Sequence, residues 1–264
     1  MPITPGQEAF RTHYNYIHCL KDLIQGTTLN YPGIGQIIQA PLPFLDRKRN
    51  FIDLTRRSIN DEARIVRLDA EYSYASTSWL PIKSYYLLFN LMLTIDYLIT
   101  LDERAFRNGH ARCSSGFTEK LETGKIVFGE PLLNIIYDQG IFSYRPPSGT
   151  NLRQTILRNS HRQQVMKKIA QYKLEEWQRS RAIPSFKSLR NRQAKSTYLD
   201  TFKLSIFEFP YYMRLRANYR DFAFIDGVTA LDTRDYFNDY FTFSVGLYRA
   251  LNGLKNQLYR ARTT

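Results

Sequence analysis

The stretch WLPIKSYYLLFNLMLTIDYLITL, residues 79–101, is the longest apolar tract in the sequence. It is interrupted by Asn90, Thr94 and Asp96, whereas a membrane span needs about 20 predominantly apolar residues with few or no charges. We therefore interpret the stretch as a buried helix, and we expect Asp96 to be paired because a lone buried carboxylate is costly. A helix that is apolar on nearly every face must be surrounded by other helices. The sequence thus predicts an all-α fold, a helical bundle built around residues 80–101.

Composition limits the class of protein. With 264 residues, 43% hydrophobic and 14% aromatic, the chain can bury a sizeable core as one large domain or two small ones. Its formal net charge of +13 attracts phosphate backbones or other anionic surfaces. Two cysteines and four scattered histidines offer no zinc-site spacing, and so few cysteines suit a reducing compartment. The N-terminus lacks a basic region followed by an apolar run. We therefore expect a cytoplasmic protein with no membrane span, metal or cofactor.

Apolar residues recur at helical spacing in other parts of the chain. A first helix starts near residue 4 and runs to about residue 25. Residues 44–74 form either one long helix or two helices that break at residues 60–61. Residues 233–262 form a closing helix with Asp232 as its N-cap. No segment alternates apolar and polar residues over a useful length, so a sheet is not expected.

The boundaries around the central helix also follow from the sequence. Ser78 is expected to be its N-cap, and Pro81 lies in the first turn, where a missing N–H costs nothing. Residues 104–117 form a polar connection, and residues 117–126 are expected to form a short helix.

Residues 151–195 contain twelve lysines and arginines but only two acids, Glu175 and Glu176, a net charge of +10. An apolar face at helical spacing runs through this segment as far as Pro184. A charge run is commonly the solvated face of an amphipathic helix, but solubility alone is served by charges of both signs. We therefore predict contact with RNA or DNA. The cations assigned to that contact are Arg158, Arg162, Lys167, Lys168, Lys173, Arg179, Arg181, Arg190 and Arg192.

The sequence has no P-loop, dinucleotide fingerprint, serine-hydrolase elbow or zincin motif. Two polar clusters remain, and the first contains Arg104 and His110. Histidine can move the proton of a 2′-hydroxyl and arginine can hold the charge developing on phosphate, which suits RNA cleavage without a metal. The alternatives are surface arginines with an ordinary loop histidine, or a nucleophilic pair of His110 with Cys113. The second cluster, also assigned to nucleic-acid contact, comprises Arg214, Arg216, Asn218 and Tyr219.

Four segments follow one another in a recognisable order. They are SYYLLFNLMLTIDYLI (84–99), GHARCSSGFTEKLETGKIVF (109–128), RLRANYRDFAFI (214–225) and TALDTRDYFNDYFTFSVGLYRALNGL (229–254). Together they resemble HEPN domains of the nucleotidyltransferase-associated type, helical domains of many prokaryotic toxin, antitoxin and defence proteins. That branch typically has a Tyr-Tyr helix, a small-residue turn, an R-x-x-A-x-Y stretch and a long closing helix rich in aromatics. The resemblance covers residues 79–128 and 206–262.

The resemblance implies an up-down helical bundle, often dimeric, with a polar groove that binds RNA or nucleotide. Ribonucleases of this family use an arginine followed four to six residues later by histidine, with a polar residue directly after the arginine. Arg104 and His110 match that spacing, although Ala105 stands at the polar position. Arg214 and Arg216 stand nearer the family's usual place, but no histidine follows them within six residues.

We divide the chain into N-terminal helices that pack on the bundle (1–78), a HEPN-like bundle (79–128 and 206–264) and a basic helical insertion (129–205). The predicted function is an RNA- or DNA-binding component of a bacterial toxin–antitoxin or antiphage defence system. One alternative is a metal-independent endoribonuclease. Another is a structural subunit of a multiprotein complex that packs on a partner chain through the aromatic residues of 236–248. The expected partners are RNA or DNA, with a second copy of the chain or a protein such as a nucleotidyltransferase or nuclease.

Overall fold

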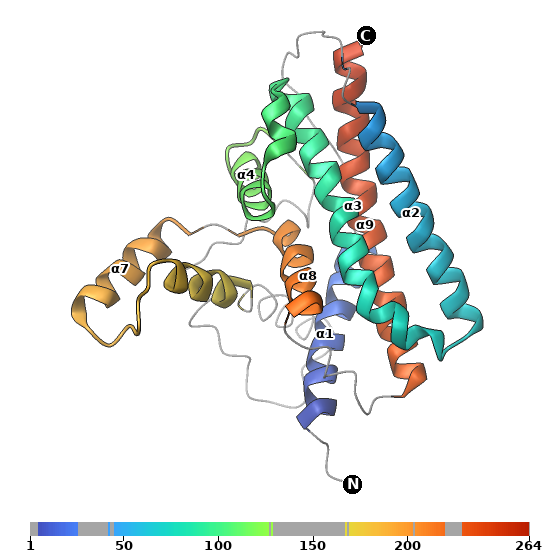
Figure 1. Cartoon of the computed structure of the whole chain (residues 1–264), viewed down its shortest axis with the longest axis horizontal. Helices are drawn as coiled ribbons and strands as arrows, with labels where there is room; N and C mark the ends of the chain where they lie inside the picture. Colours follow the sequence, from blue (N-terminus) through green and yellow to red (C-terminus); the bar gives the residue numbers. More distant parts are fainter. Residues whose placement is uncertain are drawn as a thin grey trace.

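The computed structural model describes residues 5–25, 42, 45–126, 128, 167, 169–202, 204–219 and 229–263 (Figure 1). Within these residues all regular structure is helical, which confirms the predicted all-α fold. None of the helices described there is long and apolar enough to cross a membrane. The long helices are α1 (Pro5–Gln25), α2 (Leu45–Leu68), α3 (Tyr72–Thr100) and α9 (Ala230–Thr263). The shorter ones are η1 (Glu103–Arg107), α4 (His110–Glu122), helical residues 169–180, α7 (Leu189–Asp200), η2 (Ile206–Glu208) and α8 (Phe209–Tyr219).

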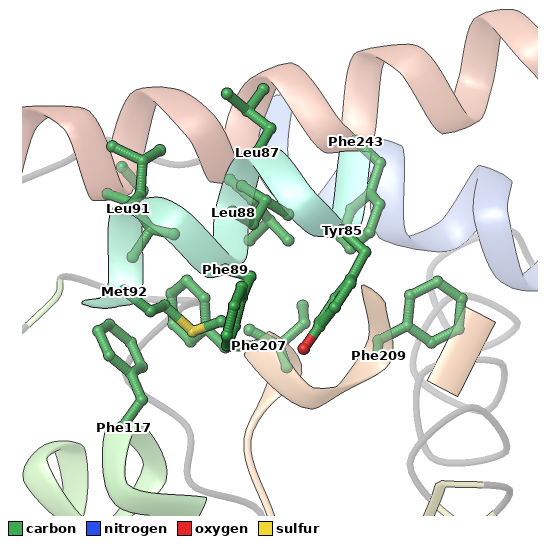
Figure 2. Packing of buried hydrophobic residues seen from close by; sticks show 14 of the residues in the cluster. Tyr85, Leu87, Leu88, Phe89, Leu91, Met92, Phe117, Phe207, Phe209 and Phe243 are labelled. Atoms are coloured by element: carbon green, nitrogen blue, oxygen red, sulfur yellow. The ribbon is translucent and has the colours of Figure 1, made fainter. Parts of the chain in front are cut away.

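Helix α3 is the centre of the fold, and its residues 87–95 are buried without interruption. Helices α2 and α9 lie along one side of α3, while α4 and α8 pack on the other (Figure 1). Figure 2 shows aromatic side chains from α4, η2 and α9 packed around α3, namely Phe117, Phe207 and Phe243. The apolar tract is therefore the core of a helical bundle, as the sequence predicts.

Helix α9 runs parallel to α3 and contacts it at both ends. At the start, Ser73 Oγ donates to the carbonyl oxygen of Ala230 at 3.2 Å. At the other end, Arg262 donates from Nε to the Leu98 carbonyl at 2.8 Å and from Nη2 to the Ile99 carbonyl at 2.9 Å. The last carbonyl groups of a helix have no partner within it, so Arg262 satisfies two groups at the end of α3.

The polar residues that interrupt the apolar tract all have partners. Lys48 of α2 donates from Nζ to Asn90 Oδ1 at 2.9 Å. Asp96 forms an ion pair through Oδ1 with Lys120 Nζ of α4 at 2.8 Å, and its Oδ2 accepts from Asn108 Nδ2 at 3.3 Å. These contacts confirm the expected pairing of Asp96. They also fix the positions of α2 and α4 on α3, because hydrogen bonds and ion pairs are directional while apolar burial is not.

Helix α3 begins at Tyr72, earlier than the sequence predicts. Ser78 is not its N-cap but an interior residue, whose Oγ donates to the Ala75 carbonyl at 2.7 Å, and Pro81 also lies inside the helix. The reason is packing, since small buried residues at helical spacing extend the interface with α9 beyond the expected cap. These residues are Ser73, Ser76 and Thr77.

Three other helices also have boundaries that differ from those predicted from the sequence. Helix α2 is continuous through residues 60–61 but ends at Leu68, so the segment 44–74 does break, at residues 69–71 rather than at 60–61. Helix α4 begins at His110 rather than near residue 117, which makes His110 a helical residue and not part of a loop. The N-terminus of α9 is capped by Thr229 rather than Asp232. Thr229 Oγ1 accepts from the Asp232 backbone N–H at 3.1 Å and donates to Asp232 Oδ2 at 2.7 Å.

Helix α1 packs closely against α9. His18 Nδ1 lies 2.7 Å from Asp239 Oδ2, and Lys21 Nζ lies 3.0 Å from Asp239 Oδ1. Further along the interface, a Cβ at position 246 would lie 1.5 Å from Ile24 Cγ2. Gly246 is therefore required for this close approach of the two helices.

We predict that Gly246→Ala destabilises the fold by about 1–3 kcal/mol, because the new methyl group overlaps Ile24 and forces the helices apart. Gly116→Ala in α4 is the matched control, since its Cβ would meet only Lys120 Nζ at 3.9 Å. That control should gain about 0.5–1 kcal/mol from helix propensity. Thermal or chemical denaturation measures both changes. A stabilised Gly246→Ala variant would contradict the α1–α9 packing.

Candidate nucleic-acid interface

Helical residues 169–180 and α7 form a hairpin, here named the basic arm (residues 169–200), which extends away from the bundle (Figure 1). Ser188 caps α7 by accepting a hydrogen bond from the Asn191 backbone N–H at 3.2 Å, and α7 buries none of its residues. Between Trp177 and Leu199 the sequence has six lysines and arginines and no acid. Lys195 is half-buried, and the five exposed cations are Arg179, Arg181, Lys187, Arg190 and Arg192.

Aromatic contacts hold the two helices of the basic arm together. The Trp177 ring lies 4.5 Å from that of Tyr198 and 6.4 Å from that of Phe186, nearly parallel to both. Tyr198 Oη donates to the Lys173 carbonyl at 3.5 Å, and the Lys195 ammonium lies 5.2 Å from the centre of the Phe186 ring. The arm thus has a small aromatic core of its own, which holds its exposed cations in a defined arrangement.

A buried ion pair joins the basic arm to the bundle. Lys173 Nζ lies 2.6 Å from Oε2 of Glu208, a residue of η2 that is only 3% exposed. The other carboxylate oxygen accepts from Thr118 Oγ1 at 3.0 Å, and that hydroxyl lies 2.9 Å from Ser205 Oγ. Lys173 was assigned to nucleic-acid contact from composition, but its ammonium is engaged inside the protein. We therefore leave Lys173 out of the proposed interface.

Lys167 and Arg214 were also assigned to nucleic-acid contact from the sequence. Lys167 is half-buried just before the basic arm. In the second polar cluster, the side chain of Arg214 is described and buried. The residues whose side chains lie outside the described part of the chain are Arg158, Arg162, Lys168, Arg216, Asn218 and Tyr219.

His110 of α4 and Arg214 of α8 belong to different polar clusters of the sequence, but in the structure they lie close together against α3. His110 Nδ1 is 2.9 Å from Tyr85 Oη. The guanidinium carbon of Arg214, a residue 7% exposed, lies 5.2, 5.6 and 5.8 Å from the ring centres of Tyr85, Tyr86 and Tyr211. Within the described part of the chain, Arg214 Nε is buried without a hydrogen-bond partner. The cluster therefore combines an imidazole, a phenol and a guanidinium group from α4, α3 and α8.

The surroundings set the protonation of this cluster. Burial lowers the pKa of His110 below its ordinary value of 6.5, and the charge of Arg214 lowers it further. Burial raises the pKa of Tyr85 far above its ordinary value, so the hydroxyl keeps its proton. At neutral pH the imidazole is uncharged and can accept a proton, while the adjacent guanidinium can stabilise negative charge.

Arg104 does not join His110. Arg104 is exposed, and its Nη2 and Nε lie 2.7 and 2.8 Å from Asp102 Oδ2. It lines a cleft of about 470 Å³ together with Arg107 and Arg112. Among the described contacts of His110, the neighbouring cation is Arg214 and not Arg104. No spacing in the sequence indicates the pairing with Arg214, because it arises where α4 and α8 both pack on α3.

Burial bears on two alternatives from the sequence, the nucleophilic cysteine and the aromatic partner surface. Burial raises the pKa of Cys113 to about 12, so its thiol stays protonated and is a poor nucleophile. The aromatic residues of 236–248 are largely inside the bundle, with Tyr236 1% exposed and Phe237, Tyr240 and Phe243 fully buried. These four rings are therefore not available as a surface for a partner chain, whereas Phe241 and Tyr248 are half-buried.

The described residues include no group of three or more His, Cys, Asp or Glu side chains placed to hold a metal ion. No family model, curated protein or solved structure matches this chain. Fold and site define an all-α protein with an exposed basic arm and a partly buried His–Arg–Tyr cluster.

We predict that Glu208→Leu destabilises the protein by about 3–5 kcal/mol, because Lys173 is left without its counter-charge in a largely buried site. The double variant Glu208→Leu with Lys173→Met removes both charges and should recover much of that loss. Chemical denaturation of the single and double variants measures the free energies of unfolding. Wild-type stability in the single variant would show that this ion pair does not hold the arm.

Proposed function

We propose that this chain binds RNA or DNA through the basic arm. The main observation is the run of six cations without an acid between residues 177 and 199, on a hairpin that stands outside the bundle. Within the described residues, Arg181, Arg190 and Arg192 form no ion pair. Exposed cations without neutralising acids bind a phosphate backbone and gain free energy from the counterions it releases.

We also propose that the chain is a cytoplasmic, HEPN-like component of a toxin–antitoxin or antiphage defence system. This proposal rests on the sequence resemblance. In support, the segments of α4, α8 and α9 that take part in the resemblance all pack against α3. Isolation from its own cells with a second copy, a nucleotidyltransferase or a nuclease would support the proposal, and isolation as a lone monomer would count against it.

A second candidate function is metal-independent RNA cleavage, favoured by the proximity of His110 and Arg214. When His110 Nδ1–H donates to Tyr85 Oη, Nε2 is the ring nitrogen that can accept a proton. His110 would take the proton of the 2′-hydroxyl as the 2′-oxygen attacks phosphorus, and the 5′-oxygen would leave by taking a proton from water. Arg214 would stabilise the charge that develops on the phosphate oxygens. The products would be a 2′,3′-cyclic phosphate and a free 5′-hydroxyl.

For the binding function, we predict that replacing Arg181, Arg190 and Arg192 by Gln weakens nucleic-acid binding roughly a hundredfold near 0.1 M salt. The slope of log K against log salt concentration should fall by about 2–3, because each phosphate contact contributes about 0.7–0.9. Filter binding or fluorescence anisotropy at several salt concentrations measures both quantities.

The matched control replaces Arg57, Arg64 and Arg67 by Gln. These exposed arginines of α2 lie on the opposite side of the bundle (Figure 1), and the net charge changes by the same amount. The control should retain affinity and slope. Equal losses in the two triple variants would mean that only net charge matters, and an unaffected arm variant would contradict the proposed interface.

For the cleavage function, we predict that His110→Ala reduces the rate about a hundred- to ten-thousand-fold, with RNA affinity retained. Because the base must be neutral, the rate should rise with pH through the lowered pKa of His110 and reach its plateau at a lower pH than a histidine with an ordinary pKa would give. Single-turnover cleavage in the presence of chelator measures the rate.

Arg214→Gln should also abolish cleavage, whereas Arg104→Gln, which removes the arginine bound to Asp102, should not. If Arg104→Gln abolished cleavage and Arg214→Gln did not, the catalytic pair would be Arg104 and His110, as the sequence spacing predicts. Cleavage that requires a metal, or that survives His110→Ala, would rule out this mechanism.

A further inference from the structure

A second cleft, named the tyrosine cleft, lies where the basic arm meets the bundle and has a volume of about 270 Å³. Its walls are helical residues 169–180, α4 and α8. Small-molecule sites typically occupy about 300–1,000 Å³, so this cleft suits a single flat group. Its lining includes Arg112, Ser114, Ser115, Tyr172, Glu176 and Tyr211.

The tyrosine cleft has hydrogen-bonding capacity that the protein does not use itself. Ser114 is 1% exposed, and in the described part of the chain its Oγ has no hydrogen-bond partner. A buried hydroxyl without a partner is unfavourable, and such groups in native proteins usually indicate a missing ligand or water. Burial, and then the charge of Glu176, raise the pKa of Tyr211 to about 12. Glu176 and Tyr211 both line the cleft.

We propose that the tyrosine cleft holds one unpaired nucleobase, so that the chain prefers single-stranded nucleic acid to duplex. This inference rests on the proposed nucleic-acid function and narrows its substrate class. Tyr172 and Tyr211 provide aromatic surface for stacking, which is tolerant of base identity. Glu176 can accept hydrogen bonds from the N–H groups of a base edge, and the Ser114 hydroxyl can form a hydrogen bond with a further polar atom of the base. In a duplex those edges are paired and the faces stacked, so a base cannot enter.

The tyrosine cleft connects the basic arm with the His110–Arg214 cluster. Tyr211 lines the cleft, and its ring centre lies 6.4 Å from that of His110 and 5.8 Å from the guanidinium carbon of Arg214. Arg112 lines both this cleft and the one beside Arg104. A strand attached to the arm would therefore meet an aromatic site at the root of the arm, with arginines available for the flanking phosphates.

The test is to block the tyrosine cleft from its rim. Ser115 is exposed and lines the cleft, so Ser115→Phe fills the entrance without removing a packed side chain. Glu119→Phe, on an exposed position of the same helix outside the cleft, is the matched control. Fluorescence anisotropy gives Kd for a short single-stranded RNA and for a duplex of the same sequence. Wild type and Glu119→Phe should prefer the single strand by about tenfold or more, and Ser115→Phe should lose this preference with its duplex affinity unchanged.

A second blocking variant, Ala111→Phe at another exposed position of the rim, should behave as Ser115→Phe does. Circular dichroism establishes that each variant is folded. An unchanged preference in both blocking variants would overturn the tyrosine cleft as a base site. Equal affinity of wild type for the single strand and the duplex would also overturn it. If the triple variant of Arg181, Arg190 and Arg192 still lost affinity in that case, the proposed binding through the basic arm would stand. If wild type bound neither RNA, the nucleic-acid function itself would be wrong.

Discussion

The burial of α3 on every side is the constraint on which the rest of the structure depends. Residues 87–95 have no exposed face, so the helix must be enclosed by several others. Its polar groups then need specific partners, which Lys48 of α2, Lys120 of α4 and Arg262 of α9 provide. Apolar burial drives the association of these helices, and the polar contacts determine which helix lies where.

The same enclosure brings the functional groups together. Helices α4 and α8 both pack on α3 around Tyr85, and this places His110 beside Arg214 in surroundings that keep the imidazole neutral. Helix α7 of the basic arm buries none of its residues, and Arg181, Arg190 and Arg192 form no ion pair within the described residues, so these three cations serve no evident structural purpose. In our account, the arm supplies phosphate affinity, and the bundle supplies a base pocket and a His–Arg pair at the root of the arm.

The sequence predicted the all-α class, the central helix and the pairing of Asp96, because each follows from burying one long apolar tract. It did not predict the start of α3, since Ser78 is a favourable cap locally but packing of small residues against α9 extends the helix past it. Composition identified the cations of the arm, but not the internal role of Lys173, which depends on a carboxylate that η2 brings to it. His110 and Arg214 lie together because α4 and α8 both pack on α3. No spacing between residues in the sequence indicates this contact.

The central claim is that nucleic acid lies along the basic arm and enters the tyrosine cleft. Photo-crosslinking of the whole chain to a single-stranded RNA that carries 4-thiouridine, followed by peptide mass spectrometry, tests it most directly. The account predicts crosslinks within residues 177–199 and on the peptides that contain Tyr172 and Tyr211. Crosslinks confined to α2 or α9, or none at all under conditions in which the RNA is bound, would contradict it.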